Sequence, residues 1–384
     1  MTSDVHPSSR KSAIYQPELD GLRAIAIGFV LLFHCLAVPT DGATAWLSWI
    51  VGLMWCGVDL FFVLSGFLIT GILLDTRDDS KRWSTFLARR TLRVFPLYYF
   101  WLVVVFWVLP QFIHTTPITP QQAEPWCWTY TFNWYIWEIN QFVYPATINH
   151  FWSLAVEEQF YLLWPLVVFT IPVRHLGTIC LVGICASMAW KYNLYFSSCI
   201  HSFPIYTATP LRVDALLGGG LVAWMVRNPA AVNTRLLHSL LTGVGLLVLL
   251  ALMHLRGLEN LPGIHKFAAC LLTSFFALVF PALLRFLISH PNSVPVRFLS
   301  WRIFRPVAKL SYGLYVCHYI IFYIALRGYR EELLLASKNS GLPAWFVLFA
   351  VTVSLSGLVS AILYLLVERP MLSLKRHFSY SQSE

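Results

Sequence analysis

The stretch LRAIAIGFVLLFHC, residues 22–35, decides the fold class of this chain. All ten residues between Arg23 and His34 are apolar or Gly, and such a run favours a helix surrounded by lipid. Charged residues make up 12% of the 384-residue chain, against about 25% in soluble domains. The mean hydropathy is +0.65. No A-x-A-like cleavage site follows the first apolar run, so we expect it to remain as a helix.

Ten segments approach the roughly 20 apolar residues that a membrane-spanning helix needs. They are 22–40, 50–74, 94–113, 151–171, 175–192, 207–226, 236–255, 264–288, 307–327 and 343–367. We therefore predict an all-α fold, a polytopic membrane helix bundle of about ten transmembrane helices. The expected division is an N-terminal arm at 1–20, a transmembrane domain at 21–370 and a tail at 371–384.

The distribution of Lys and Arg predicts which side of the membrane the termini occupy. With both termini inside, the inner segments hold 20 of the 27 Lys and Arg residues and the outer loops hold 5. Inner loops of membrane proteins carry such an excess of positive charge. The predicted topology is therefore N-in and C-in. Topology also explains the net charge of +9, so no nucleic-acid partner is expected.

Loop 114–150, on the predicted outer side, has no Lys or Arg and is rich in Trp, Tyr and Pro. Aromatic residues of this kind suit the membrane interface, so we expect a cap over the helices. Two of the eight cysteines, Cys127 and Cys199, lie in outer loops and form a disulfide only if they approach each other on an oxidising side. No Cys and His pair has zinc spacing, so no metal site is predicted.

Arg23 and His34 are predicted to share one face of the first helix. An α-helix turns 100° per residue, so eleven residues bring the two side chains to within about 20° of each other. The rise between them is about 16 Å, which places Arg23 at the inner surface and His34 near mid-membrane. An arginine alone at this depth is an ordinary interfacial anchor. The aligned histidine favours a functional path between the two depths.

The segment HFWSLAVEEQFYLLWP, residues 150–165, carries two carboxylates into the membrane. Glu157 and Glu158 lie a turn or two below the outer surface, a depth that His34 can share. A carboxylate beside an imidazole fixes its tautomer and builds a general base for an alcohol. Adjacent residues point 100° apart, so we expect one glutamate to face His34 and the other to be structural.

The segment FLARRTLRVFPLYY, residues 86–99, is placed in a cytoplasmic loop. Arg89, Arg90 and Arg93 fall within one helical turn, and Arg90 and Arg93 share a face. Guanidinium groups bind phosphate well. The alternative is an anchor to anionic lipid, which juxtamembrane arginines commonly provide.

Further polar residues lie inside predicted membrane helices. Asp59 and Ser65 belong to the second helix, where Gly66 permits close helix packing. We expect Asp59 to pair with another polar group. In RVDALLGGG, residues 212–220, Arg212 and Asp214 are expected to neutralise each other.

The segment KLSYGLYVCHY, residues 309–319, adds Ser311, Tyr312, Tyr315 and His318. Ser311, Tyr315 and His318 recur at helical spacing and share a face. A site role for His318 stands beside the alternative that it is only a hydrogen bonder within the bundle.

Five blocks resemble the integral-membrane acyltransferase family 3, the O-acetylating enzymes of bacterial cell-surface glycans. The blocks are ELDGLRAIAIGFVLLFH, GVDLFFVLSGFLITGIL, FLARRTLRVFPLYY, FWSLAVEEQFYLLWP and KLSYGLYVCHY, and VERP at 367–370 fits as well. They run in family order from residue 18 to 370. The family's Arg–ten residues–His motif falls on Arg23 and His34, and its Arg-x-x-Arg motif on Arg90 and Arg93. Its tryptophan-to-glutamate block falls on Trp152 through Tyr161.

The resemblance implies a multi-pass enzyme of the bacterial inner (cytoplasmic) membrane. The donor would be an acyl-CoA, usually acetyl-CoA, on the cytoplasmic side, and the acceptor a hydroxyl of a glycan or lipid-linked sugar. No permanently bound cofactor is expected. Some members carry an extra extracytoplasmic esterase-like domain, and no counterpart of it is expected in this sequence.

The resemblance also assigns roles within this sequence. His34 is the base or the acyl carrier, assisted by Glu157 or Glu158. Two further groups of residues complete the expected site. Acyl-CoA binding is expected from Arg23, Arg90, Arg93 and Ser65, with Asp59, Tyr161, Tyr312 and His318 as supporting polar groups.

Two other functions are weighed against the enzyme. A proton-coupled transporter or flippase would use His34 and the glutamates as a proton relay. Such proteins often contain inverted repeats, and no internal symmetry is visible here. A non-catalytic scaffold gives no reason for the five blocks to occur together. The acceptor's hydroxyl position, the acyl length and the oligomeric state are left open.

Overall fold

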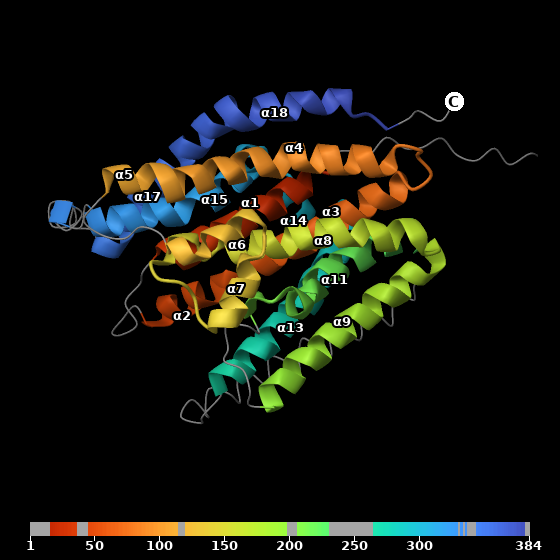
Figure 1. Cartoon of the computed structure of the whole chain (residues 1–384). Helices are drawn as coiled ribbons and strands as arrows, with labels where there is room; N and C mark the ends of the chain where they lie inside the picture. The colour runs from red at the N-terminus through yellow and green to blue at the C-terminus, as the bar shows by residue number, and fades with distance from the viewer. Residues whose placement is uncertain are drawn as a thin grey trace, which may run out of the picture.

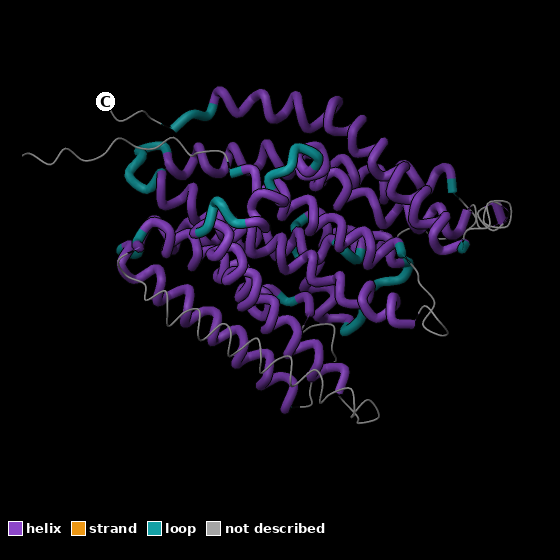
Figure 2. Tube along the Cα trace, turned by 180° about the vertical axis from the view of Figure 1, so that it is seen from behind, coloured by secondary structure: helices purple, strands orange, loops and turns teal. Residues whose placement is uncertain are grey.

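The computed structural model describes residues 16–36, 45–113, 120–197, 206–229, 264–328, 331–332, 335 and 343–380. Within these ranges the regular structure is helical and no strand occurs, which confirms the predicted all-α class. Long helices pack side by side into one bundle when seen from the front (Figure 1) and from behind (Figure 2).

Nine of the ten predicted membrane segments coincide with long helices. These are α1 (Pro17–Cys35), α3 (Gly57–Asp75), α4 (Arg82–Val103), α8 (Phe151–Thr170), α9 (Val173–Phe196), α11 (Thr209–Arg227), α13 (Ile264–Ser289), α15 (Phe304–Gly328) and α17 (Ala344–Leu363). The tenth segment, 236–255, lies outside the described residues. Shorter helices are α2 (Ala45–Leu53), α5 (Leu109–Phe112), α6 (Glu124–Trp128), α7 (Phe132–Ile139), α14 (Val294–Leu299) and α18 (Arg369–Ser373).

Two helix boundaries differ from the sequence prediction. The predicted helix 50–74 is interrupted by a 3₁₀ turn at Met54–Cys56, so α3 begins only at Gly57. The basic segment predicted as a loop is instead the first half of α4, which begins at Arg82. Its Leu, Ala and Arg residues are good helix formers, and no Gly or Pro interrupts them before Pro96. Helical residues also extend into the predicted arm, at Pro17, and into the predicted tail, as far as His377.

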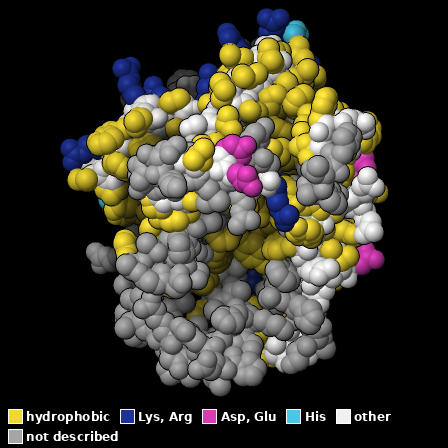
Figure 3. Space-filling view, turned by 90° about the vertical axis from the view of Figure 1, so that its left-hand side faces the viewer, with side chains coloured by type: hydrophobic (Ala, Val, Ile, Leu, Met, Phe, Trp, Pro, Cys, Tyr) yellow, Lys and Arg dark blue, Asp and Glu magenta, His cyan; other side chains and the backbone are white. Residues whose placement is uncertain are grey.

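Six helical stretches of the described chain are long and apolar enough to cross a membrane. They are Trp46–Asp75, Arg82–Phe112, Val173–Phe196, Cys270–Ser289, Phe304–Arg327 and Ala344–His377. Large apolar side chains cover the outside of the bundle, among them Leu162 (63% exposed) and Val182 (61% exposed). A space-filling view shows many hydrophobic side chains, with Lys and Arg gathered along its upper edge (Figure 3). Lipid is the solvent that suits such a surface, so this is a multi-pass membrane protein.

The three remaining long helices, α1, α8 and α11, form the inner part of the bundle. α1 packs against α3 and α15, and α11 packs against α3, α9 and α13. The α3–α11 contact is close because a Cβ at Gly66 would lie 1.9 Å from the Leu216 carbonyl oxygen, and one at Gly219 2.0 Å from that of Val63. This confirms the expected packing role of Gly66. The polar residues of α1, α8 and α11 therefore face other helices.

Residues 120–150 fold into short helices against one end of the bundle. α7 packs on α8, and the 3₁₀ turn Ala146–Ile148 packs on α15. Aromatic pairs join this cap to α4, including Tyr98 stacked on Tyr130 with ring centroids 4.2 Å apart. The hydroxyl of Tyr98 donates to the carbonyl oxygen of Cys127 at 2.8 Å. Cys127 is buried there, whereas Cys199 lies outside the described residues.

Candidate active site

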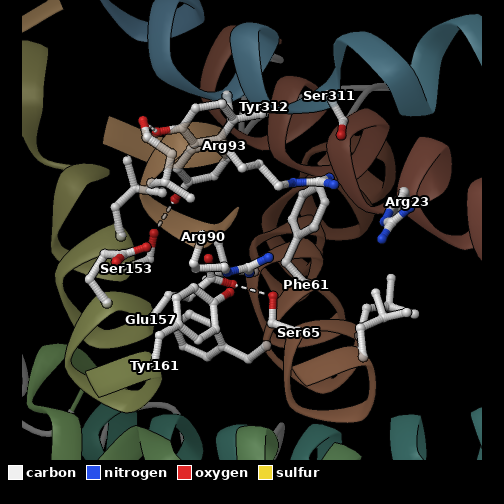
Figure 4. A pocket seen from close by; sticks show the side chains of 18 residues that line it. Arg23, Phe61, Ser65, Arg90, Arg93, Ser153, Glu157, Tyr161, Ser311 and Tyr312 are labelled. Carbon is white, nitrogen blue, oxygen red and sulfur yellow. Dashed lines mark hydrogen bonds between the residues drawn. The ribbon is translucent and has the colours of Figure 1, made fainter. Parts of the chain in front are cut away.

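A polar cavity of about 110 Å³, here called the arginine cavity, lies where α1, α3, α4, α8 and α15 meet. The three arginines predicted to bind the donor all line it, and Figure 4 shows their guanidinium groups around the same space. Five separate sequence blocks therefore converge on one place. Its predicted members are Arg23, Ser65, Arg90, Arg93, Glu157, Glu158, Tyr161 and Tyr312.

Contacts inside the arginine cavity give the glutamates local partners. Ser65 Oγ donates to Glu157 Oε1 at 2.7 Å, drawn as a dashed line in Figure 4. The guanidinium of Arg90 lies over the Tyr161 ring, 4.0 Å from its centroid. Buried Glu158 Oε1 has no hydrogen-bond partner within the described chain. Both glutamates thus line the arginine cavity.

The arginine cavity carries more positive charge than its ion pairs neutralise. Among the described residues, Arg23 contacts one carboxylate, Asp20, at 3.4 Å, and no ion pair joins Arg90 or Arg93 to any carboxylate. Glu157 and Glu158 also line the cavity, so its three arginines leave a formal excess of one positive charge. Guanidinium forks that form no ion pair, as in Arg90 and Arg93, suit a phosphate or another anion. The arrangement is therefore chemically fitted to an anionic ligand.

His34 is oriented by a second histidine. Nδ1 of His318 lies 2.7 Å from the carbonyl oxygen of Tyr315 and 3.1 Å from that of Leu314. A carbonyl oxygen only accepts, so this Nδ1 carries the proton and Nε2 of neutral His318 is an acceptor. His34 Nδ1 lies 3.0 Å from that Nε2 and must donate to it. The lone pair of His34 Nε2 is then free, as a base or nucleophile requires.

The expected contact between His34 and a glutamate of α8 is therefore wrong. His34 takes its hydrogen bond from α15, through His318, whereas Glu157 is bonded to Ser65 of α3. The physical reason lies in packing: α1 lies directly against α15, and this neighbour relation is not encoded in the spacing of either helix.

His34 lines a second cavity of about 510 Å³, here called the histidine cavity. Val58 and Tyr315 line both cavities, so they form a shared wall between them. α1 therefore carries Arg23 to the first cavity and His34 to the second, consistent with the predicted path along one helix. The remaining described lining residues are Val30, Phe33, Trp55, Phe142, Asn149, His150, Trp152, Tyr206, Leu272 and Tyr319.

A comparison with protein families matches residues 16–361 to the model described as "Acyltransferase domain". The chain belongs to this acyltransferase family. The resemblance predicted from the five sequence blocks is thereby confirmed across nearly the whole chain. No solved structure matches the chain.

Three curated relatives of this acyltransferase chain come from bacteria. It is 30% identical to "Peptidoglycan O-acetyltransferase OatA" of Listeria monocytogenes, over 82% of this chain and 50% of that protein. It is 29% identical to "O-acetyltransferase OatA" of Staphylococcus aureus, over 93% of this chain and 57% of that protein. It is 28% identical to "Putative peptidoglycan O-acetyltransferase YrhL" of Bacillus subtilis, over 81% of this chain and 49% of that protein. The chain spans about half the length of these relatives.

Two buried ion pairs beside the histidine cavity correct a further expectation. Arg212 and Asp214 do not neutralise each other. Arg212 Nη2 instead donates to Asp59 Oδ1 at 2.6 Å, and Lys191 Nζ donates to Asp214 Oδ2 at 2.5 Å. Residues two apart on a helix point about 200° apart, so each reaches a different neighbour, α3 or α9. The expectation that Asp59 pairs with another polar group is confirmed.

The supporting tyrosine of α15 has a structural partner. The hydroxyl of Tyr312 donates to the backbone carbonyl of Val94 on α4 at 2.8 Å. This bond lies in a helix that contains Pro96. Pro96 lacks the N–H that would bond the carbonyl of Leu92, so the bond from Tyr312 to Val94 is a separate link between α15 and α4.

Sequence reasoning missed several residues of the site. His150 and Tyr206 line the histidine cavity, and Ser153 Oγ lies 2.5 Å from the Tyr315 hydroxyl in the shared wall. Lys191 was counted only as a charge. These residues are polar or ionisable and lie at or near the ends of predicted helices. They were missed because only charges near the middle of the membrane were considered as site candidates.

Proposed function

We propose that this protein is a membrane O-acyltransferase that moves an acetyl group from acyl-CoA to a hydroxyl of a cell-envelope glycan. The observation that carries the proposal is the free Nε2 of His34, oriented through His318 and separated by one shared wall from three arginines. The names of the relatives support peptidoglycan as the type of glycan.

The arginine cavity would receive the donor. Arg23, Arg90 and Arg93 offer forked donors to the phosphates of CoA. A cavity of about 110 Å³ is much smaller than an acyl-CoA, so only part of the donor would lie inside it. The thin pantetheine arm would then extend toward the wall formed by Val58 and Tyr315.

His34 would accept the proton of the acceptor hydroxyl. As the hydroxyl oxygen bonds to the thioester carbonyl carbon, its proton moves to His34 Nε2. The C–S bond breaks, and the thiolate of CoA takes the proton from Nε2, which restores neutral His34. In the alternative route, Nε2 itself attacks the carbonyl carbon, the C–S bond breaks and the CoA thiolate leaves. The hydroxyl oxygen then displaces Nε2 from the acetyl group, and the hydroxyl proton neutralises the thiolate.

The proposed location is the inner membrane of a bacterium, with both termini in the cytoplasm. The excess of Lys and Arg in the predicted inner segments supports this topology, with about ten spanning helices. Donor phosphates would then enter from the cytoplasm, where acyl-CoA is available. No observation favours the proton-coupled transporter, and membership of an acyltransferase family argues against it.

The His318→Leu variant is expected to lower kcat on the order of 10- to 100-fold, the same scale as the loss when a metal-binding histidine loses its hydrogen-bond partner. Leucine cannot accept the proton of His34 Nδ1, so the ring loses its fixed tautomer. His318→Gln, whose Oε1 can accept, should restore part of kcat. The measurement is steady-state kinetics of acetyl transfer with the KM for acetyl-CoA as the internal control. Equal losses in both variants would contradict a role for this hydrogen bond.

The donor assignment is tested with purified protein, acetyl-CoA and a soluble glycan fragment. Release of CoA is followed by chromatography, because the eight cysteines of the chain would react with a thiol reagent. Arg93→Gln is expected to raise the KM for acetyl-CoA roughly 10- to 100-fold, since a charge-assisted hydrogen bond contributes about 1.5–3 kcal/mol.

Arg89→Gln is the matched control for that experiment. Arg89 lies on the same helix and is half-buried, but it does not line the arginine cavity, and it donates to the carbonyl of Phe378 at 2.9 Å. The KM of the Arg89→Gln variant for acetyl-CoA should stay near that of the wild type. An equal rise in both variants would indicate general attraction of an anionic donor to a basic surface. No CoA release by the wild type would reject the proposed function.

A further inference from the structure

The histidine cavity is aromatic and uncharged. Seven of its described lining residues are Phe, Tyr or Trp, and none is Asp, Glu, Lys or Arg. Two of them, Trp152 and Tyr206, pack together with ring centroids 5.0 Å apart. Trp55 meets the Tyr206 ring edge-on at 5.4 Å. These rings form one continuous aromatic wall, here defined as Trp55, Trp152 and Tyr206.

Several polar groups of the lining residues are left without protein partners, and the buried Nδ1 of His150 is one of them. The Nε2 of His34 and the hydroxyls of Tyr206 and Tyr319 make no hydrogen bond within the described part of the chain. Asn149 differs, because its side chain is used twice, accepting from the N–H of Val143 and donating to its carbonyl, both at 3.1 Å. The cavity therefore combines aromatic faces with a few unpaired hydrogen-bonding groups.

This combination matches the chemistry of a sugar ring, which has C–H faces and a rim of hydroxyl groups. A lipid tail would use the aromatic faces but leave the hydroxyls and the imidazole unpaired, and unpaired polar groups in an apolar cavity are unfavourable. The volume of about 510 Å³ lies within the roughly 300–1,000 Å³ of small-molecule sites and far exceeds the needs of an acetyl group alone.

We propose that the histidine cavity binds one uncharged sugar residue of the acceptor, stacked on the aromatic wall and hydrogen-bonded by Tyr206 and Tyr319. The proposal rests on the proposed function, because the sugar hydroxyl must come within hydrogen-bonding distance of His34 Nε2 to be acetylated. A sugar ring that carries a charge is disfavoured, since no described lining residue of opposite charge compensates its loss of hydration.

The aromatic wall has a buried cation behind it. The guanidinium of Arg212 lies 5.1 Å from the Tyr206 ring centroid and 5.7 Å from that of Trp152. Arg212 is fully buried and does not line the histidine cavity, so its charge is not offered to the ligand. It acts as a positioning residue for the two rings.

The test uses the trimer of β-1,4-linked N-acetylglucosamine as the neutral probe. With purified full-length protein and acetyl-CoA, the Tyr206→Phe/Tyr319→Phe variant is expected to raise the KM for the trimer about tenfold, since each neutral hydrogen bond contributes roughly 0.5–1.5 kcal/mol. The rings remain, so folding and stacking are preserved. Tyr135→Phe, which changes a tyrosine of α7 outside both cavities, is the matched control.

The charged probe is the same trimer without its N-acetyl groups, assayed at pH 6, where its amines are largely protonated. Its KM should exceed that of the neutral trimer by tenfold or more. Equal use of both trimers, an unchanged KM in the double variant, or CoA release that the neutral trimer does not accelerate would overturn the inference. Each of these outcomes still requires wild-type turnover of acetyl-CoA, whereas absence of any turnover would reject the proposed function instead.

Discussion

Replacing His34 with alanine is expected to reduce acetyl transfer by about 10²- to 10⁴-fold, the contribution of a positioned general base. The imidazole donates from Nδ1 to His318, its Nε2 forms no hydrogen bond within the described residues, and the ring lines the histidine cavity. Alanine removes that lone pair and leaves the arginine cavity intact. The loss should therefore appear in kcat, with the KM for acetyl-CoA unchanged, in the chromatographic assay of CoA release.

The His290→Ala variant is the control, because His290 is exposed just after the end of α13, where its ring contacts the carbonyl and the ring of Phe286 and lines neither cavity. Its turnover should match the wild type. The same assay with labelled acetyl-CoA and no acceptor separates the two routes. Label retained on wild-type protein, and absent from His34→Ala, indicates the acyl-carrier route. Full turnover by His34→Ala would refute a chemical role for this histidine.

The positions of the helices were predictable because hydrophobic runs are a local property of the sequence. The apolar residues between Arg23 and His34 form α1, as predicted, and the two side chains line one cavity each. The convergence of Arg90 and Arg93 with Arg23 was predicted from family motifs. The position of a helix can be read from its own segment of sequence. The joint role of the arginines can be read from motifs that other members of the family share.

Partners between helices were much harder to predict. His34 was expected to meet a glutamate of α8, but its partner is His318 of α15. Helical periodicity fixes the angle between residues on one helix, but not the rotation of that helix relative to its neighbours. The depth of His34 in the membrane reduces the number of candidate partners. It does not identify one partner, because several polar residues lie at the same depth. Only the packing of α1 against α15 selects one of them.

The same limit explains the incorrect pairing of Arg212 with Asp214. Their proximity in sequence suggested mutual neutralisation, yet their side chains leave the helix in opposed directions and reach Asp59 and Lys191. The close approach of α3 and α11 at Gly66 brings Asp59 within reach. A charge cluster of two cations and two anions results, which the sequence shows only as separate polar residues.

The Arg212→Met variant is expected to destabilise the protein by roughly 3–5 kcal/mol, the cost of breaking a buried ion pair by removing one partner. Both groups of this pair are buried, with side-chain exposures of 0% for Arg212 and 1% for Asp59. Methionine fills much of the space, so the loss comes mainly from leaving Asp59 uncompensated. The measurement is thermal unfolding of the detergent-solubilised protein, followed by intrinsic tryptophan fluorescence.

Two further variants decide whether the buried charge is the cause. Arg227→Met breaks the ion pair with Asp75 on the same two helices, but those side chains are 30% and 54% exposed, so a loss of about 1 kcal/mol or less is expected. Asp59→Leu/Arg212→Met removes both buried charges together and should recover most of the stability, because an apolar pair avoids the desolvation penalty. The aromatic wall would still lack its cation in the double variant. Recovered stability with a raised KM for the sugar probe would then separate the role of Arg212 in holding Trp152 and Tyr206 from its role in folding. If Arg212→Met unfolded no earlier than Arg227→Met, the buried pair would contribute no more than a surface pair.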